Sequence, residues 1–220
     1  MSKAKTSGST KDAKTNASNS VRSNENPAAD LDNPSKFQPT EEADLDAVAL
    51  DAEDGLQKLF LDSLKDLYWA ENHLIKALPK MINAASLPAL QEALSNHLEE
   101  TKGHVERLNQ VFQLLGEEPQ AKKCDAMEGL TKEGEGCIES TDAGTPARNL
   151  AIILSSQKVE HYEISSYTGL IGLAVKLGQE EAADLLELTL EEEESSDELL
   201  AEIAENEIVP GELPGEESED

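Results

Sequence analysis

Hydrophobic residues recur every three or four positions over four long stretches of this chain, and this spacing predicts four long α-helices. In the first stretch, for example, Leu64, Leu67, Leu74 and Leu78 fall on one face. The expected long helices cover residues 50–84, 88–115, 146–177 and 179–207, and a short helix covers residues 124–140. Because these helices account for most of the apolar residues, we expect an all-α fold.

Prolines and glycines mark the ends of these helices. Pro88 and Pro146 suit a first helical turn, and Gly116 and Gly178 are typical of helix ends. Pro79 falls inside the first helix, where we expect it to kink or locally open the backbone.

The connection between the second and third long helices, residues 117–146, is too long for a tight hairpin turn. It fits a crossover that runs the length of a bundle. We therefore predict a four-helix bundle of the ferritin type, made of two helical hairpins and a long crossover with a short helix. The hairpins also resemble each other, since AENH and HLEET in the first correspond to VEHY and TLEEE in the second.

The two ends of the chain differ in composition from the helical part. Residues 1–50 are rich in Ser, Lys, Asn, Asp and Pro, and they contain few large apolar residues. Such a segment buries too little surface to offset the entropy of ordering, so we expect a disordered N-terminal tail. Residues 51–208 would form the bundle, and residues 209–220 an acidic, disordered C-terminal tail.

Acidic residues interrupt the buried stripes of the predicted helices. In the segment QKVEHYEISSY, Glu160 and Glu163 lie one turn apart, on a stripe that also carries Ile153 and Tyr167. Glu71 is the acid in the stripe of the first helix. Buried carboxylates are unfavourable unless protons, basic partners or a metal ion neutralise them. We expect Tyr167 to lie in the core, where it could hydrogen-bond a ligand.

Residues equidistant from the turn of an antiparallel hairpin lie at the same height. The equidistant pairs are Glu71 with Glu100, Glu163 with Glu193, and Glu160 with Asp197. Each of the four helices therefore brings an acid to the middle of the bundle. This counting favours Glu193 over Glu192, whereas the similarity of the hairpins aligns Glu192 with Glu100.

Histidines of the second helix flank this level. His97 and His104 lie one turn before and one turn after Glu100. Carboxylates with one or two imidazoles suit a pair of Fe or Mn ions. We favour His104 as the ligand and interpret His97 as a core histidine or a partner of a ligand, although the choice between them stays open. His73 and His161 are expected to face outward.

Net charge and cysteine content limit the partners and the cellular location that we expect. The net charge is −28, which argues against nucleic acid and anionic membranes as partners. Two cysteines, Cys124 and Cys137, are too few for a disulfide framework, and we expect reduced thiols. We find no membrane span and no secretory signal, so we expect a cytoplasmic protein.

Four segments together resemble the YciE/YciF family of ferritin-like bacterial stress proteins: HLEETKGHVERL, CDAMEGL, QKVEHYEISSY and TLEEEESSDELL. The likeness covers about residues 55–205. It implies a ferritin/rubrerythrin-like bundle that dimerises and is linked to bacterial stress responses. By similarity to di-iron ferritin-like sites, the implied ligands are Glu71, Glu100, Glu160, Glu163 and Glu193 through oxygen and His104 through nitrogen.

Two features depart from the usual di-iron pattern. Glu100 and His104 are four residues apart rather than the commoner three, and Asp197 stands where a second histidine is usual. Three hypotheses follow. In the first, the protein binds two Fe or Mn ions, which react with O₂ or peroxide or are handled as metal cargo. If such a protein is an enzyme, it is an oxidoreductase. The others are a metal-free structural homodimer and a storage cage.

Overall fold

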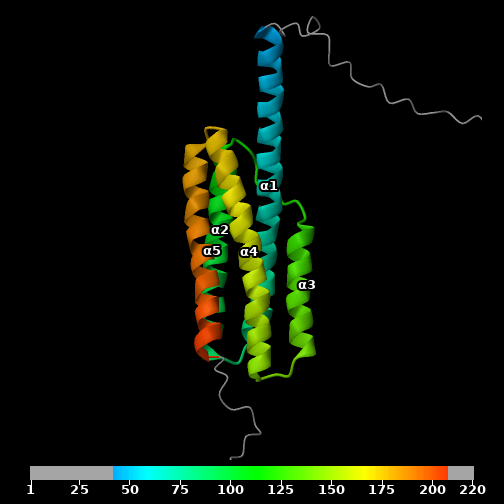
Figure 1. Cartoon of the computed structure of the whole chain (residues 1–220), viewed down its shortest axis with the longest axis vertical. Coiled ribbons are helices and arrows are strands. Elements are labelled where there is room, and N and C mark those ends of the chain that lie inside the picture. Colours follow the sequence, from blue (N-terminus) through cyan, green and yellow to red (C-terminus); the bar gives the residue numbers. More distant parts are fainter. Residues whose placement is uncertain (1–41, 208–220) are drawn as a thin grey trace, which may run out of the picture. The chain divides into compact units, whose positions relative to one another are not determined.

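The computed structural model describes residues 42–207, and this part of the chain consists of five helices and the loops that join them, without a β-strand (Figure 1). The helices are α1 (Glu42–Ala84), α2 (Pro88–Leu114), α3 (Asp125–Ser140), α4 (Pro146–Lys176) and α5 (Glu180–Glu207). The predicted all-α fold is confirmed. Except at the start of α1, the helix boundaries match the predicted ones to within one residue.

Helix α1 begins at Glu42, inside the segment that we expected to be a disordered tail. The prediction for residues 42–50 is therefore wrong. These residues, EADLDAVAL, contain neither glycine nor proline, and Ala, Leu and Glu favour helix. Acidic side chains also stabilise the first turns of a helix. The remaining predicted tails, residues 1–41 and 209–220, lie outside the described residues.

The signals for helix ends act as expected. Gly116 and Gly178 have φ of 72° and 69°, in the left-handed region that favours glycine after a helix. Thr145 caps α4 with its side chain and is followed by Pro146 at the first helical position. Helix α1 continues through Pro79 to Ala84, although Pro79 has no N–H to donate to the preceding turn.

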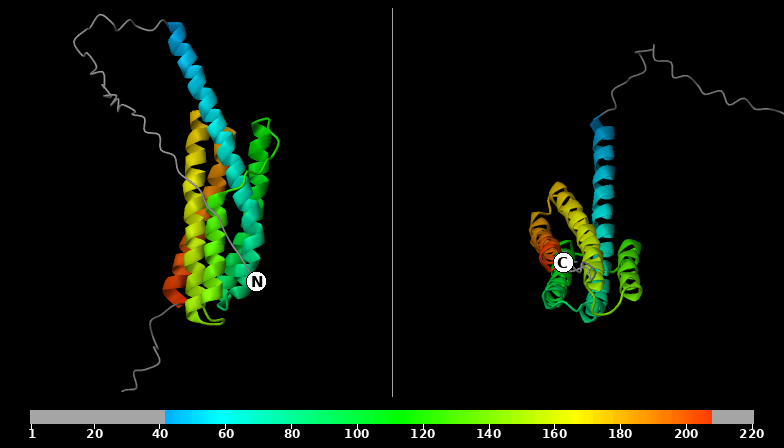
Figure 2. Two further views of the ribbon diagram at one scale, coloured as in Figure 1. Left: turned by 90° about the vertical axis from the view of Figure 1, so that its right-hand side faces the viewer. Right: turned by 60° about the horizontal axis from the view of Figure 1, so that its bottom comes forward.

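The four long helices form a bundle of two antiparallel hairpins, α1–α2 and α4–α5. Figure 1 and Figure 2 show α1 beside α4, α2 beside α5, and α3 on the outside against α1 and α4. The connection from α2 to α4 runs along the bundle, as predicted.

Side chains of α3 and of the segment before it attach this crossover to the bundle. Cys124 Sγ lies 3.0 Å from the Tyr162 hydroxyl on α4. His73 Nε2 lies 2.9 Å from Thr131 Oγ1 on α3, so the prediction that His73 faces outward is wrong. Both cysteines are free, as expected.

The core changes character along the bundle axis. Toward the α4–α5 turn it is built from large apolar side chains such as Phe60, Leu64 and Phe112, and toward the other end from Leu90, Ile152 and Ile153. Between these layers, carboxylates and imidazoles replace the apolar side chains. None of the described helices is both long and apolar enough to cross a membrane.

Candidate metal centre

Six ionisable side chains meet in the middle of the bundle, and each residue is at most 4% exposed. Helix α1 contributes one of them, α2 two, α4 two and α5 one. We call this set the acid–imidazole cluster; it consists of Glu71, His97, His104, Glu160, Glu163 and Glu193. The apolar layers above and below separate it from solvent.

The ligand atoms of the cluster fall into two neighbouring groups. In the first group, His97, Glu160, Glu163 and Glu193 each offer one atom, and all these atoms lie within 4.8 Å of one another. Glu71, His104 and Glu193 form the second group by the same criterion. Glu193 belongs to both groups. Two adjacent positions that share a carboxylate are what a pair of metal ions in a helical bundle requires.

Hydrogen bonding within the protein leaves this cluster unsatisfied. Nine buried side-chain nitrogen and oxygen atoms of the described residues have no hydrogen-bond partner, and eight of them belong to the cluster. The ninth is Ser156 Oγ. Buried polar atoms without partners are unfavourable and uncommon in folded proteins. Their concentration at one place fits a set of donors for cations.

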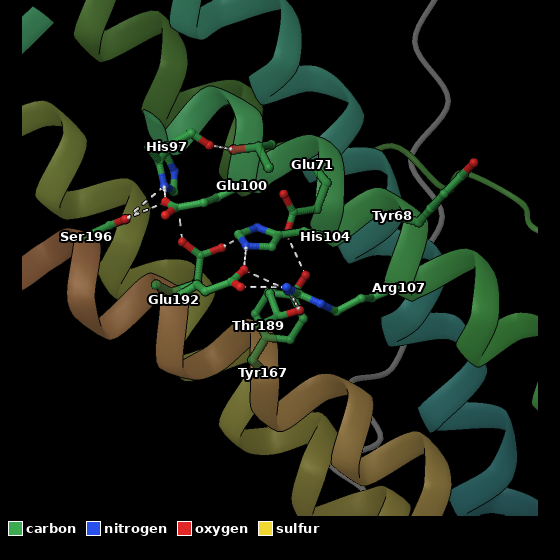
Figure 3. A network of polar contacts seen from close by, with 12 residues as sticks. Tyr68, Glu71, His97, Glu100, His104, Arg107, Tyr167, Thr189, Glu192 and Ser196 are labelled. Carbon is green, nitrogen blue, oxygen red and sulfur yellow. Dashed lines mark hydrogen bonds and ion pairs between the residues drawn. The ribbon is translucent and has the colours of Figure 1, made fainter. Parts of the chain in front are cut away.

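The imidazole of His104 is held from both sides (Figure 3). Its Nδ1 lies 3.0 Å from Glu193 Oε1 and 3.5 Å from Glu71 Oε1, inside the cluster. Its Nε2 lies 2.9 Å from Glu192 Oε2, outside the cluster. Arg107 in turn donates to both oxygens of Glu192, at 2.6 and 2.8 Å. Such an outer carboxylate orients a metal-binding imidazole and fixes which nitrogen faces the metal.

His97 is held in the same manner, through a hydroxyl group. Its Nε2 faces the cluster, 3.5 Å from Glu160 Oε2 and 3.9 Å from Glu193 Oε2. Its Nδ1 lies 3.0 Å from Ser196 Oγ, and Ser196 donates to Glu100 Oε2 at 3.5 Å. A proton on Nδ1 of His97 leaves the lone pair of Nε2 directed into the cluster.

Tyr167 lies next to the cluster, as predicted. Its buried hydroxyl donates a hydrogen bond to Glu71 Oε1, while Glu71 Oε2 has no partner. Burial raises the pKa of Tyr167 well above its usual value, so the phenol stays protonated and keeps donating. One oxygen of Glu71 is therefore occupied and the other is free.

Without cations, protons must compensate the charge of the cluster. Burial raises the pKa of Glu160 and Glu163 well above the usual value. Burial alone would lower the pKa of both histidines, but the neighbouring carboxylates outweigh it and raise the pKa of His97 to about 9 and that of His104 to about 11. Burial acts to raise the pKa of Glu193, but its contacts with the two imidazoles lower it. The metal-free cluster thus retains protons that a cation can displace.

Most of the predicted site residues come together. Glu71, His104, Glu160, Glu163 and Glu193 all belong to the cluster, and their roles as ligands remain predictions. Glu193 is buried in the cluster, whereas Glu192 is half-buried beside Arg107, so Glu193 stays the predicted ligand of the two.

Two predicted residues lie outside the cluster. Asp197 points to the edge of the bundle, where it contacts His161 Nε2 at 3.1 Å and Gln157 Nε2 at 3.2 Å, so the prediction that Asp197 faces inward is wrong. Counting from the turn fixes height but not rotation about the helix axis, and position 197 is rotated about 40° from position 193. Glu100 lies on the outer side of His97, with Oε2 3.7 Å from Nδ1 of the imidazole and a second link through Ser196. His161 faces outward, as predicted.

His97 is the cluster member that we did not favour as a ligand. The sequence contains a signal for it, because His97 and His104 are two helical turns apart and so lie on one face of α2. The interpretation as a core histidine was correct about its burial. It missed that Nε2 faces the carboxylates.

Comparisons with known proteins agree with the sequence resemblance. The family described as domain of unknown function DUF892 matches residues 55–211. The protein YciF of Escherichia coli strain K12 is 44% identical over 154 residues, which are 70% of this chain and 92% of that protein.

Solved structures show the same fold. The crystal structure of the E. coli stress protein YciF matches with a TM-score of 0.66 at 44% identity, over 69% of this chain and 95% of that chain. YcfI from Rhodopseudomonas palustris matches with a TM-score of 0.64 at 41% identity, over 66% and 92% of the two chains. A Xanthomonas campestris protein, 24% identical with a TM-score of 0.55 over 68% and 91%, supports the fold alone. The chain therefore belongs to the DUF892 family of YciF-like proteins.

Proposed function

We propose that this chain is a stress protein that binds a pair of Fe or Mn ions in the acid–imidazole cluster and takes part in oxidant or metal handling. The observation that carries the proposal is the pair of buried donor groups that share Glu193 and contain eight polar atoms without hydrogen-bond partners. The stress role is supported by the description of YciF, the 44% identical relative, as a stress protein.

The protein's residues would divide the work as follows. His97 and His104 would supply nitrogen ligands, and Glu71, Glu160, Glu163 and Glu193 oxygen ligands. Bound Fe or Mn ions would supply Lewis acidity and electron exchange with O₂ or peroxide. Such a protein would be a di-iron or di-manganese oxidoreductase if it turns over an oxidant.

The outer residues would keep the donors in place while the ions bind. Ser196 with Glu100, and Glu192 with Arg107, would hold the two imidazole rings with their inner nitrogens free. The Tyr167 hydroxyl would hold Glu71 through one oxygen and leave the other for a cation. The apolar layers on either side would exclude water, so the charges would interact strongly.

Anaerobic reconstitution tests the proposal. Metal-free protein is incubated with Fe²⁺ or Mn²⁺, desalted and analysed for metal; we expect about two ions per chain, as in di-metal bundles. The Glu160→Gln/Glu163→Gln variant should retain far less metal. The matched control is Glu191→Gln/Glu194→Gln, which changes two exposed acids of α5 and should keep the native content. Native protein that takes up no metal would reject the proposal.

A second candidate is a metal-free structural bundle that acts as a homodimer. It is favoured by the raised pKa values of Glu160 and Glu163, because protons alone can neutralise the buried carboxylates. A structural role has also been proposed for the R. palustris relative YcfI. This function predicts that Glu160→Ala leaves stability unchanged or raises it, with or without metal. Loss of a metal-dependent gain in Tm in that variant would argue against it. Sizing chromatography tests the dimer and separates it from a storage cage.

A further inference from the structure

The two groups of the acid–imidazole cluster are unequal in donors. The group around His97 offers one imidazole and three carboxylates, whereas the group around His104 offers one imidazole and two carboxylates. We call these the His97 position and the His104 position. Both positions include Glu193. The His97 position adds Glu160 and Glu163, and the His104 position adds Glu71.

The His97 position also has more carboxylate oxygens without a hydrogen-bond partner than the His104 position. Both oxygens of Glu163 and Oε2 of Glu160 lack partners, so the His97 position has three free oxygens besides those of Glu193. At the His104 position, Tyr167 already donates to Glu71 Oε1, and only Oε2 of Glu71 is free. A cation at the His97 position therefore gains more oxygen ligands and more negative charge.

A fixed positive charge lies on the side of the His104 position only. Arg107 donates to Thr189 Oγ1 at 3.0 Å and to both oxygens of Glu192. The hydrogen bond with Glu192 is the main cause that raises the pKa of Arg107, so the guanidinium stays charged behind His104. Among the described residues, no lysine or arginine pairs with His97, Glu160 or Glu163.

The guanidinium also neutralises the acid behind His104. Glu192 accepts from Nε2 of His104, and a free carboxylate there would make the imidazole a stronger ligand. With Arg107 bound to both of its oxygens, Glu192 orients the ring but adds no net negative charge. At the His97 position, by contrast, no lysine or arginine of the described residues pairs with Glu100, whose contacts are Ser196 and the imidazole itself.

We infer that the two ions bind in order, first at the His97 position and then at the His104 position, and that Arg107 keeps the affinity of the second position low. This inference rests on the proposed di-metal function and adds the order of loading. The second ion would then be the exchangeable one, and Arg107 a residue that sets its affinity without touching it.

An anaerobic Mn²⁺ titration followed by electron paramagnetic resonance tests the order, because the spectrum separates free, isolated and magnetically coupled Mn²⁺. In the native protein we expect isolated bound Mn²⁺ up to one equivalent and coupled pairs only beyond it, with the second ion bound roughly tenfold or more weakly. His104→Ala should retain the tight ion, and His97→Ala should lose it.

Arg107→Gln tests whether Arg107 is the reason that the second ion binds more weakly than the first. We expect the second ion to bind roughly tenfold more tightly in this variant, with the first unchanged. Lys102→Gln, which removes an exposed cation of the same helix, is the matched control and should change neither ion. Far-ultraviolet circular dichroism checks that each variant is folded.

Three results would overturn the inference. Coupled pairs that form below one equivalent would show that the positions fill together. A tight ion that is lost in His104→Ala but kept in His97→Ala would reverse the order. An unchanged second affinity in folded Arg107→Gln would remove Arg107 as the cause. Native protein that binds no Mn²⁺ at all would instead reject the proposed function, and the order with it.

Discussion

The two hairpins of the bundle are similar in sequence but contribute different chemistry to its centre. The first hairpin, α1–α2, supplies both imidazoles and a single acid, Glu71. The second, α4–α5, supplies the other three acids and no histidine. Where the first hairpin has His97 and His104, the similar segment of the second has Thr189 and Ser196 at the same spacing.

These hydroxyl residues serve the imidazoles of the other hairpin. Ser196 contacts the outer nitrogen of His97, and Thr189 accepts from Arg107, which holds the acid behind His104. The corresponding acids Glu100 and Glu192 likewise stand behind the two rings. A repeated position can thus keep its location beside the centre while its role changes from facing the cluster to supporting a residue that faces it.

The largest effect is expected where the hairpins share a donor. Glu193 is the only cluster member on α5 and belongs to both groups. Glu193→Gln keeps the volume but removes the charge, so we expect metal content to fall from about two ions per chain to nearly none. Elemental analysis after anaerobic loading measures this, with Glu194→Gln on the exposed face as the control. A fully loaded Glu193→Gln variant would contradict the bridging role.

The next largest effect is on the pH dependence of stability, because the two histidines of the first hairpin hold protons in the folded state. The folded pKa values of His97 and His104, about 9 and about 11, exceed the ordinary histidine pKa of 6.5, so the folded metal-free protein binds more protons than the unfolded chain above pH 6.5. Its stability should fall between pH 6.5 and 9, by up to about 1.4 kcal/mol per pH unit for each such proton.

In the proposed function, metal ions would displace these protons, so metal affinity should rise over the same interval. The stabilisation by Mn²⁺, measured as the difference in Tm between loaded and metal-free protein, should be larger at pH 9 than at pH 6.5. A difference that shrinks with pH would mean that the imidazoles are not the groups being displaced.

A smaller effect is expected from the acids of the second hairpin in the metal-free protein. Glu163 is fully buried and neither of its oxygens has a partner. Glu163→Met has a similar volume and removes this unfavourable burial, so it should raise the metal-free free energy of unfolding by about 1–3 kcal/mol. Urea unfolding with and without Mn²⁺ measures this. The variant should also lose most of the gain from metal; a native-like gain would argue against Glu163 as a ligand.

The smallest effect is expected at the supporting hydroxyl. Ser196→Ala removes the partner of His97 Nδ1, and we expect roughly tenfold weaker binding of the tighter ion. Ser195→Ala is the matched control, since Ser195 is exposed and hydrogen-bonds only to its own helix, at the carbonyl of Glu191. Isothermal titration of both variants measures the difference. Equal affinities would show that Ser196 only fills space.

Much of this arrangement could be predicted from the sequence because it follows from local signals. Pro88, Gly116, Pro146 and Gly178 fix helix ends, and counting from the turns gives the height of the acids. Rotation about a helix axis depends on packing, which is why Asp197 was placed wrongly. The helical start of α1 does not follow from apolar content, because residues 1–50 contain few large apolar residues and such a composition is typical of disorder. Residues 42–50 nevertheless favour helix locally.

The most direct test of the central claim is anomalous diffraction from crystals grown with Mn²⁺. We predict two anomalous peaks inside the bundle, one bounded by His97, Glu160, Glu163 and Glu193 and one bounded by Glu71, His104 and Glu193. Crystals whose bundle interior shows no anomalous peak in the presence of Mn²⁺, while the side chains keep their positions, would contradict the claim.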